Sequence, residues 1–191
     1  MDRIDEMKDY LTPIWNERFS EDQKKIEDYF NTHKKVISLE FKAIIHNIVS
    51  QVCSLQEVGE QCEITYLVIS YLYSSLLNKG YQFEITLCNE SLYIDKNSIT
   101  TYWCPEFLYQ YTVEEELYLQ KELQKKYIRI KPYELESLRQ DLFLQYWDIA
   151  KSYFQILVKQ LKESAEFKKV KINGELRVLY GEHMGELKEF I

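Results

Sequence analysis

The chain has 191 residues, of which 46% are hydrophobic and 29% charged, and its formal net charge is −7. This length and hydrophobic content suit a folded chain with a sizeable core, and we expect residues 1–191 to form a single globular domain. Only 5 Gly and 3 His are present, and the sequence contains no phosphate-binding glycine loop, zinc motif or nucleophile elbow. The composition therefore argues against the common enzyme classes, and we expect no cofactor and no metal.

Tyrosine is abundant, with 16 residues beside 9 Phe and 3 Trp. The residue types with GC-rich codons (Ala, Gly, Pro and Arg) total 16, whereas those with AT-rich codons (Ile, Lys, Tyr, Phe, Asn and Met) total 72. This bias is typical of a low-GC bacterium, a phage or a mobile element, and it explains most of the tyrosine excess. The remainder fits the enrichment of tyrosine at protein interfaces.

The sequence gives several indications of the compartment. No basic segment followed by an apolar run begins the chain, so we expect no secretory signal. The longest apolar run, Ile64 to Leu77, contains polar residues and is shorter than the roughly 20 residues of a membrane span. The cysteines at positions 53, 62, 88 and 104 lack C-x-x-C spacing, which indicates reduced thiols. We therefore expect a cytoplasmic protein without membrane contact.

The first part of the chain has helical patterns. A capping-box pattern at 20–23 predicts the start of one helix, and a longer helix is expected at about 34–57, where apolar residues recur at i, i+3, i+4 and i+7. Gly59 is typical of a helix end. The segment 61–79 is apolar nearly all round, and we predict that it is the central core helix.

The pattern then changes to the period of a β-strand. Apolar and polar residues alternate over 81–87, which predicts a strand with one buried face. Polar turns separate this segment from two further predicted strands, at 92–95 and 99–103. Pro105 ends the run because it cannot donate a ladder hydrogen bond. The sequence therefore predicts a three-stranded antiparallel meander at about 81–104.

The last part returns to helices before a final β segment. A second capping-box pattern predicts a helix over about 112–126, and Pro132 suits the first turn of a long helix over about 132–166. The Asn173-Gly174 pair between two strand-like segments predicts a C-terminal β-hairpin at about 169–180. The expected fold is α+β: a mostly helical single domain of about five helices, with the meander and this hairpin.

Charge is distributed unevenly. Residues 40–120 contain 11 acids and 3 bases, and residues 121–171 contain 12 bases and 7 acids. Such a dipolar chain can associate with itself, or its two halves can face different partners. Cations interleaved with tyrosines form a basic patch that would suit a single-stranded nucleic acid: Lys121, Lys125, Lys126, Arg129 and Lys131. A solvated helix end explains the same residues, and the negative net charge argues against nucleic acid as a partner.

Two further segments are candidates for function. Glu182, His183 and Glu186 could form an acid–base cluster, but a polar loop after the hairpin is the favoured explanation. An aromatic segment around Pro105 forms a candidate interaction surface: Trp103, Phe107, Tyr109 and Tyr111. Its alternative role is to fill the core.

These observations favour a non-catalytic cytoplasmic interaction or regulatory protein, of the inhibitor or immunity type, with a protein partner or self-association. The first alternative is an enzyme whose site is assembled from dispersed Glu, His and Tyr residues. The second is a protein that binds or imitates nucleic acid.

Overall fold

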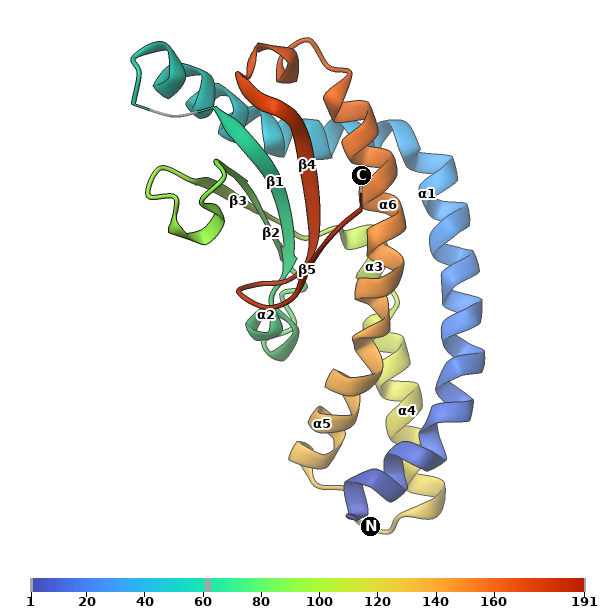
Figure 1. The fold of residues 1–191 in the computed structure, drawn as a ribbon. Coiled ribbons are helices and arrows are strands. Elements are labelled where there is room, and N and C mark those ends of the chain that lie inside the picture. The colour runs from blue at the N-terminus through green and yellow to red at the C-terminus, as the bar shows by residue number, and fades with distance from the viewer. Residues whose placement is uncertain (1, 61–62, 191) are drawn as a thin grey trace. The chain divides into compact units, whose positions relative to one another are not determined.

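The computed structural model describes residues 2–60 and 63–190 (Figure 1). The fold is α+β and mostly helical, as the sequence predicts, and the described residues form six α-helices and five strands. Contacts divide the chain into two compact units, residues 1–33 with 105–150 and residues 34–104 with 151–191. The prediction of one domain over residues 1–191 stays a prediction.

Helix α1 (Arg3–Glu57) replaces the two helices that the sequence predicts before Gly59. Ser20, the predicted cap, lies inside it and is exposed. One buried apolar stripe continues at helical spacing past this position, and burial of such a stripe outweighs a local capping preference. The stripe contains Met7, Leu11, Trp15, Phe19, Ile26, Phe30, Ile37, Phe41, Ile45, Ile48 and Val52.

The first unit combines the start of α1 with a set of helices and an aromatic core. Its other helices are α3 (Glu106–Tyr109), α4 (Thr112–Lys126), α5 (Pro132–Phe143) and the start of α6 (Gln145–Lys162). Trp15 stacks on Phe19 and on Phe143, with ring centroids 5.4 and 5.3 Å apart. The sequence predicts one helix over 132–166, but the structure has two, α5 and α6, which are separated at Leu144.

The second unit contains a mixed five-stranded sheet in the order β3-β2-β1-β4-β5. The strands are β1 (Ile64–Tyr71), β2 (Phe83–Cys88), β3 (Ile99–Trp103), β4 (Ile172–Glu182) and β5 (Leu187–Glu189). Strands β1 and β4 are parallel, and the other neighbours are antiparallel. Short helical segments connect them: α2 (Tyr73–Leu77), η1 (Leu92–Ile94) and η2 (Phe167–Lys169).

The prediction of a central core helix over 61–79 is wrong for the described part of that segment, because residues 64–71 form β1; residues 61 and 62 lie outside the described residues. Residues 67–70 of this central strand are all buried, with Val68 in a small apolar cluster on the face away from α1 and α6, so the segment lacks alternation and resembles a buried helix. The meander is also formed differently: β1, β2 and β3 are its strands, and the predicted strand at 92–95 is instead the 3₁₀ helix η1.

The predicted hairpin at 169–180 does not form: Lys169 ends η2, and residues 172–180 are part of one continuous strand, β4. Gly174 does have a positive φ of 69°, as the turn prediction requires. However, the chain forms an irregularity in the parallel pairing opposite Ile64 and Tyr66 and then continues in the same direction. The C-terminal hairpin is formed by β4 and β5.

Helices cover one face of the sheet. In this unit the second half of α1 and the end of α6 lie against that face (Figure 1). Their contacts are aromatic. The ring centroid of Phe154 lies 4.9 Å from that of Phe83, 5.6 Å from that of Trp103 and 6.0 Å from that of Phe41. The opposite face carries a smaller apolar cluster of Val68, Cys88 and Leu179. This face is the one that bears the site described below.

One described helix, α1, has an 18-residue stretch long and apolar enough to cross a membrane by length and composition, and 39% of that stretch is buried within the protein. The core helix of a soluble protein passes the same test. In the second unit the stripe residues of α1 from Ile37 to Val52 are buried, and the Phe41 ring centroid lies 5.2 Å from that of Trp103 on β3.

Two glycines of β4 differ in what a methyl group would meet. A Cβ at Gly181 would lie 2.0 Å from the carbonyl oxygen of Glu186, whereas a Cβ at Gly174 would meet no atom within 4 Å. We predict that Gly181→Ala lowers the free energy of unfolding by about 3 kcal/mol, because the β4–β5 backbone must separate. Gly174→Ala, whose only cost is its positive φ, should lower it by about 1 kcal/mol. Urea unfolding measures both, and equal losses would contradict the packing of β5.

Candidate functional site

A cavity of about 220 Å³ opens on the face of the sheet opposite α1 and α6. Its lining comes from β1, β2, the loop containing η1, β3 and the β4–β5 turn. Polar side chains form most of its wall: Glu84, Thr86, Tyr93, Ser98, Thr100 and His183. Apolar side chains form the rest: Val68, Cys88, Leu92 and Met184. Only one of these groups, the carboxylate of Glu84, is an acid.

Glu84 is held in place by two side chains, those of His183 and Tyr102. Its Oε1 lies 3.0 Å from His183 Nδ1, and its Oε2 accepts a hydrogen bond of 3.1 Å from the Tyr102 hydroxyl. Glu84 and Tyr102 are cross-strand neighbours, so the sheet places both on the same face. Partial burial and the neighbouring carboxylate raise the pKa of Tyr102, so the phenol stays protonated and donates.

The His183 ring is positioned by the turn that follows β4. Its backbone N–H donates to the Tyr71 carbonyl at 3.2 Å, and its ring meets the edge of Tyr93 at a centroid distance of 5.8 Å. Nδ1 is buried and makes no well-aligned hydrogen bond despite its short distance to Glu84. A buried polar atom in this state has a free-energy cost that a small shift or a ligand would relieve.

Backbone strain borders the cavity on two sides. Leu92 and Met184, which precede Tyr93 and follow His183, have positive φ angles of 51° and 56°. The left-handed region is costly for a residue with a bulky side chain, and such residues concentrate at binding sites. The Tyr93 hydroxyl accepts a hydrogen bond of 3.1 Å from the Met184 N–H, which joins the two strained segments.

The remaining polar groups of the cavity are neutral. The hydroxyls of Thr86 and Thr100 lie 2.9 Å apart and hydrogen-bond to each other. Burial, with a smaller effect from Asp95, raises the pKa of the Cys88 thiol to about 12. The thiolate is the nucleophilic form, so Cys88 is protonated and inert at neutral pH. The cavity therefore offers one negative charge among hydroxyls and aromatic rings, which is the chemistry that receives a cation.

The predicted acid–base cluster of Glu182, His183 and Glu186 is replaced by a different pair. His183 does meet a carboxylate, but that carboxylate belongs to Glu84 on β2. The sequence analysis missed Glu84 because it is one polar position in an alternating strand. Its alternation places it on the polar face of β2, but nothing local shows that the turn after β4 would reach this face.

The predicted aromatic interaction surface is mostly core. Trp103, Phe107 and Tyr109 are 3%, 6% and 5% exposed. These three side chains are therefore not available to a partner, and the alternative role, filling the core, describes them. Trp103 additionally donates its Nε1–H to Glu40 at 2.7 Å. Tyr111 is half-buried, and the Lys25 ammonium lies 5.1 Å from its ring centroid.

The predicted basic patch is exposed, at the end of α4 and in the connection to α5. Lys125 pairs with Glu122 at 2.6 Å. The Lys126 ammonium lies 4.7 Å from the Tyr10 ring centroid, and Lys131 lies 5.6 Å from the Tyr133 ring centroid. These cations already contact aromatic rings that base stacking would need. That the negative net charge argues against nucleic acid as a partner of this patch stays a prediction.

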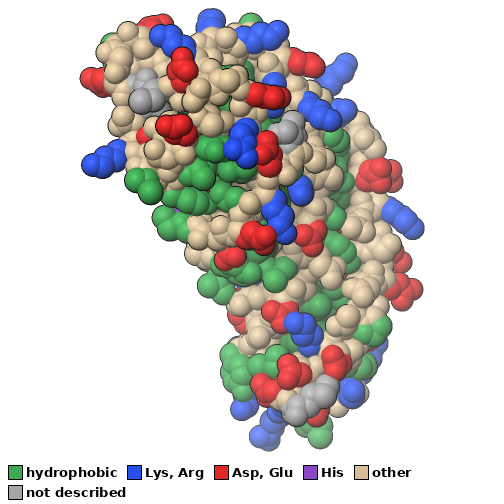
Figure 2. Space-filling model, viewed as in Figure 1, with side chains coloured by type: hydrophobic (Ala, Val, Ile, Leu, Met, Phe, Trp, Pro, Cys, Tyr) green, Lys and Arg blue, Asp and Glu red, His purple; other side chains and the backbone are tan. Residues whose placement is uncertain are grey.

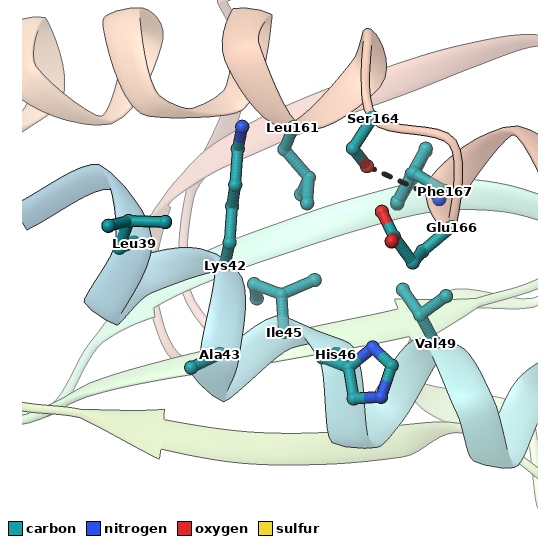
Figure 3. A pocket seen from close by; sticks show the side chains of 10 residues that line it. All are labelled: Leu39, Lys42, Ala43, Ile45, His46, Val49, Leu161, Ser164, Glu166 and Phe167. Carbon is teal, nitrogen blue, oxygen red and sulfur yellow. Dashed lines mark hydrogen bonds between the residues drawn. The ribbon is translucent and has the colours of Figure 1, made fainter. Parts of the chain in front are cut away.

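A second cavity, of about 280 Å³, lies between α1 and the segment from the end of α6 to η2 (Figure 3). Apolar side chains form most of its lining: Leu39, Ala43, Ile45, Val49, Leu161 and Phe167. Lys42, His46 and Glu166 supply its charged or titratable groups, and the Ser164 hydroxyl accepts the Phe167 N–H at 3.3 Å. Because Lys42 and Glu166 carry opposite charges, this cavity favours neither a cationic nor an anionic ligand.

A cluster of charges in the first unit is structural. Asp22 and Glu115 are fully buried. Arg18 binds Glu115 through two nitrogens, with Nε 3.0 Å from Oε2, and Lys25 binds Asp22 at 2.9 Å. Each carboxylate therefore has its own cation, which is how buried charges are tolerated. Tyr146 also donates to Asp22 at 3.4 Å.

No family model, curated protein or solved structure matches this chain. The site is therefore defined by its own geometry. Within residues 2–60 and 63–190, no three His, Cys, Asp or Glu side chains come together as a metal site requires. Cys62, one of the four cysteines, lies outside that part of the chain.

The raised pKa of Cys88 predicts a loss of stability at alkaline pH. Its folded pKa of about 12 exceeds the ordinary value of 9.0, so unfolding releases a proton above about pH 9. The free energy of unfolding should fall between pH 9 and 12, with a contribution from Cys88 on the order of 3 kcal/mol. Urea unfolding under reducing conditions measures this fall. Cys88→Ala should flatten the pH dependence, and an unchanged slope would contradict the assignment.

Proposed function

We propose that this protein is a non-catalytic interaction protein that receives a Lys or Arg side chain of a partner polypeptide in the Glu84 cavity. The observation that carries the proposal is the Glu84 carboxylate, whose side chain is only 13% exposed and contacts His183 and the Tyr102 hydroxyl. Because the carboxylate has lost much of its water, a cation placed against it gains more than at an exposed site.

The charge of the surrounding chain supports a basic partner. Residues 40–104, which contain β1, β2 and β3 and belong to the second unit, carry 7 acids against 3 bases. Such an excess attracts a cationic segment and accelerates its association, although it adds less to the final affinity. Both oxygens of Glu84 can accept further hydrogen bonds, because a carboxylate has about four acceptor positions.

The rim of the cavity supports a polypeptide rather than a free amine. Four large side chains around it are exposed: Tyr93, Ile94, Tyr102 and Met184. Ile94 and Met184 are 82% and 72% exposed, which is costly in water unless a partner covers them. A polar centre ringed by apolar and aromatic contacts is the usual arrangement of a binding hot spot. Figure 2 shows one face of the molecule, on which hydrophobic side chains lie among charged ones.

The composition adds to this proposal. An AT-rich coding bias is consistent with a regulatory, inhibitor or immunity-type protein of a low-GC bacterium, phage or mobile element, acting in the cytoplasm. In such a role, recognition of one partner matters more than turnover, and a cavity of about 220 Å³ is sufficient for one basic side chain.

A second candidate function is an enzyme that uses the same groups. The 3.0 Å approach of His183 Nδ1 to Glu84 favours it, because a carboxylate orients and supports an imidazole base. The two functions differ in the fate of the ligand. An arginine peptide recovered by mass spectrometry with unchanged mass after incubation indicates binding alone, and a changed mass indicates catalysis.

The cavity's charge predicts a selective effect of one substitution. The probe is the acetylated, amidated tripeptide Gly-Arg-Gly, titrated into the ¹⁵N-labelled protein while amide resonances are followed. We expect saturable shifts in β2, η1 and the β4–β5 turn, and at least tenfold weaker binding for Glu84→Gln, because the charge is lost and the shape retained.

The matched control is Glu186→Gln, which removes an exposed carboxylate of the β4–β5 turn. It should leave the affinity within about twofold, since exposed charges contribute little. Equal losses in the two variants would reduce the effect to general electrostatics and would overturn the Glu84 cavity as the recognition site.

A further inference from the structure

The sheet has two edges, and only one has features that prevent pairing with another chain. Edge strand β5 is three residues long, Leu187–Glu189, and two of them are charged. Edge strand β3 is Ile99–Trp103, five uncharged β-branched or aromatic residues. Short length and charge protect edge strands from unwanted pairing. Strand β3 carries no charge and is longer than β5. Its outward N–H and C=O groups form a ready template for one more strand.

We propose that the partner's basic segment adds to the sheet as a strand beside β3 and delivers its Lys or Arg side chain to Glu84 across Thr100. This inference rests on the proposed function and specifies the partner as an extended segment. Strand addition of this kind obtains affinity from main-chain hydrogen bonds and specificity from alternate side chains.

The spacing of a sheet makes the delivery feasible. Neighbouring strands lie about 4.8 Å apart, so the added strand would lie roughly 10 Å from β2, which bears Glu84. Thr100 is the residue of β3 beside the cavity, and its small side chain hydrogen-bonds to Thr86 on β2. A long Lys or Arg side chain can lie over this small residue and place its charge at Glu84. Tyr102, 52% exposed, borders the same path.

The alternation of a strand then defines a sequence preference. Side chains two residues apart point to the same face, so the basic residue and its neighbour at i+2 or i−2 both face the open side. The basic residue would lie beside Thr100, and the second would lie beside the exposed ring of Tyr102. We expect an aromatic or β-branched residue at this second position, because such cross-strand pairs are favourable.

Charge argues against a second copy of this chain as the occupant. A β3–β3 pair would bring two Glu84 cavities to the joined edge and would supply no cation from β3, which is uncharged. The net charge of −7 on each copy adds repulsion. A basic segment of a different protein satisfies both requirements.

The test uses three acetylated, amidated seven-residue peptides in which a central Arg has three Thr on each side, so that β-branched residues stand at i+2 and i−2. The first is unmodified, and the others are N-methylated on the odd or the even residues. Only alternate amides of an added strand pair with β3, so one methylated peptide should lose at least tenfold in affinity and the other should bind like the parent. Fluorescence anisotropy of labelled peptides measures the affinities. Hydrogen exchange of the protein should show new protection in β3 with the parent peptide.

The outcomes separate the two proposals. If both methylated peptides bind equally, β3 gains no protection and Glu84→Gln still weakens binding, the Glu84 cavity stands and strand addition is overturned. If no peptide binds, or Glu84→Gln changes nothing, the proposed function fails first. If the free protein proves to be a dimer whose β3 amides are already protected, the edge belongs to a second copy and the inference is overturned.

Discussion

The structure of the second unit depends on one constraint: its α-helical segments from α1 and α6 lie against one face of its sheet. Phe41, Phe83 and Phe154 supply the dry side, where aromatic rings fill the space between helix and sheet. Burial of these rings is the main driving force for that arrangement. The other face must then tolerate water, and it does so with alternating polar residues and a small apolar cluster around Val68 and Cys88. The candidate site lies on this second face, where polar side chains can stay in contact with water.

The candidate site combines parts that are separate in the sequence. Strands β2 and β3 supply a carboxylate and a phenol in register, and the turn after β4 adds an imidazole. The parallel pairing of β1 with β4 is what brings this turn to the cavity, because β4 enters the sheet on the other side of β1. Strained backbone at Leu92 and Met184 holds the two loops that close around it. The stability of the sheet therefore supports the local strain of the site.

Sequence reasoning succeeded where the signal was local. The α+β class, the helix over 112–126 and the helix start at Pro132 follow from periodicity and from proline chemistry. It failed where tertiary contacts decide. Residues 64–71 are buried in the middle of a sheet and have no amphipathic period, and Gly174 has turn geometry inside a strand. Glu84 could not be identified either, since its partner His183 arrives through parallel strand pairing that no short pattern specifies.

The central claim is that the face of the sheet opposite α1 and α6 holds a cation against Glu84. The most direct measurement is a crystal structure of the protein with the acetylated, amidated Gly-Arg-Gly peptide. The account predicts a guanidinium group within hydrogen-bond distance of the Glu84 carboxylate, with Tyr93 and Tyr102 beside it. A helix or another segment of the chain covering this face, or the guanidinium bound at a different carboxylate while the Glu84 cavity stays empty, would contradict it.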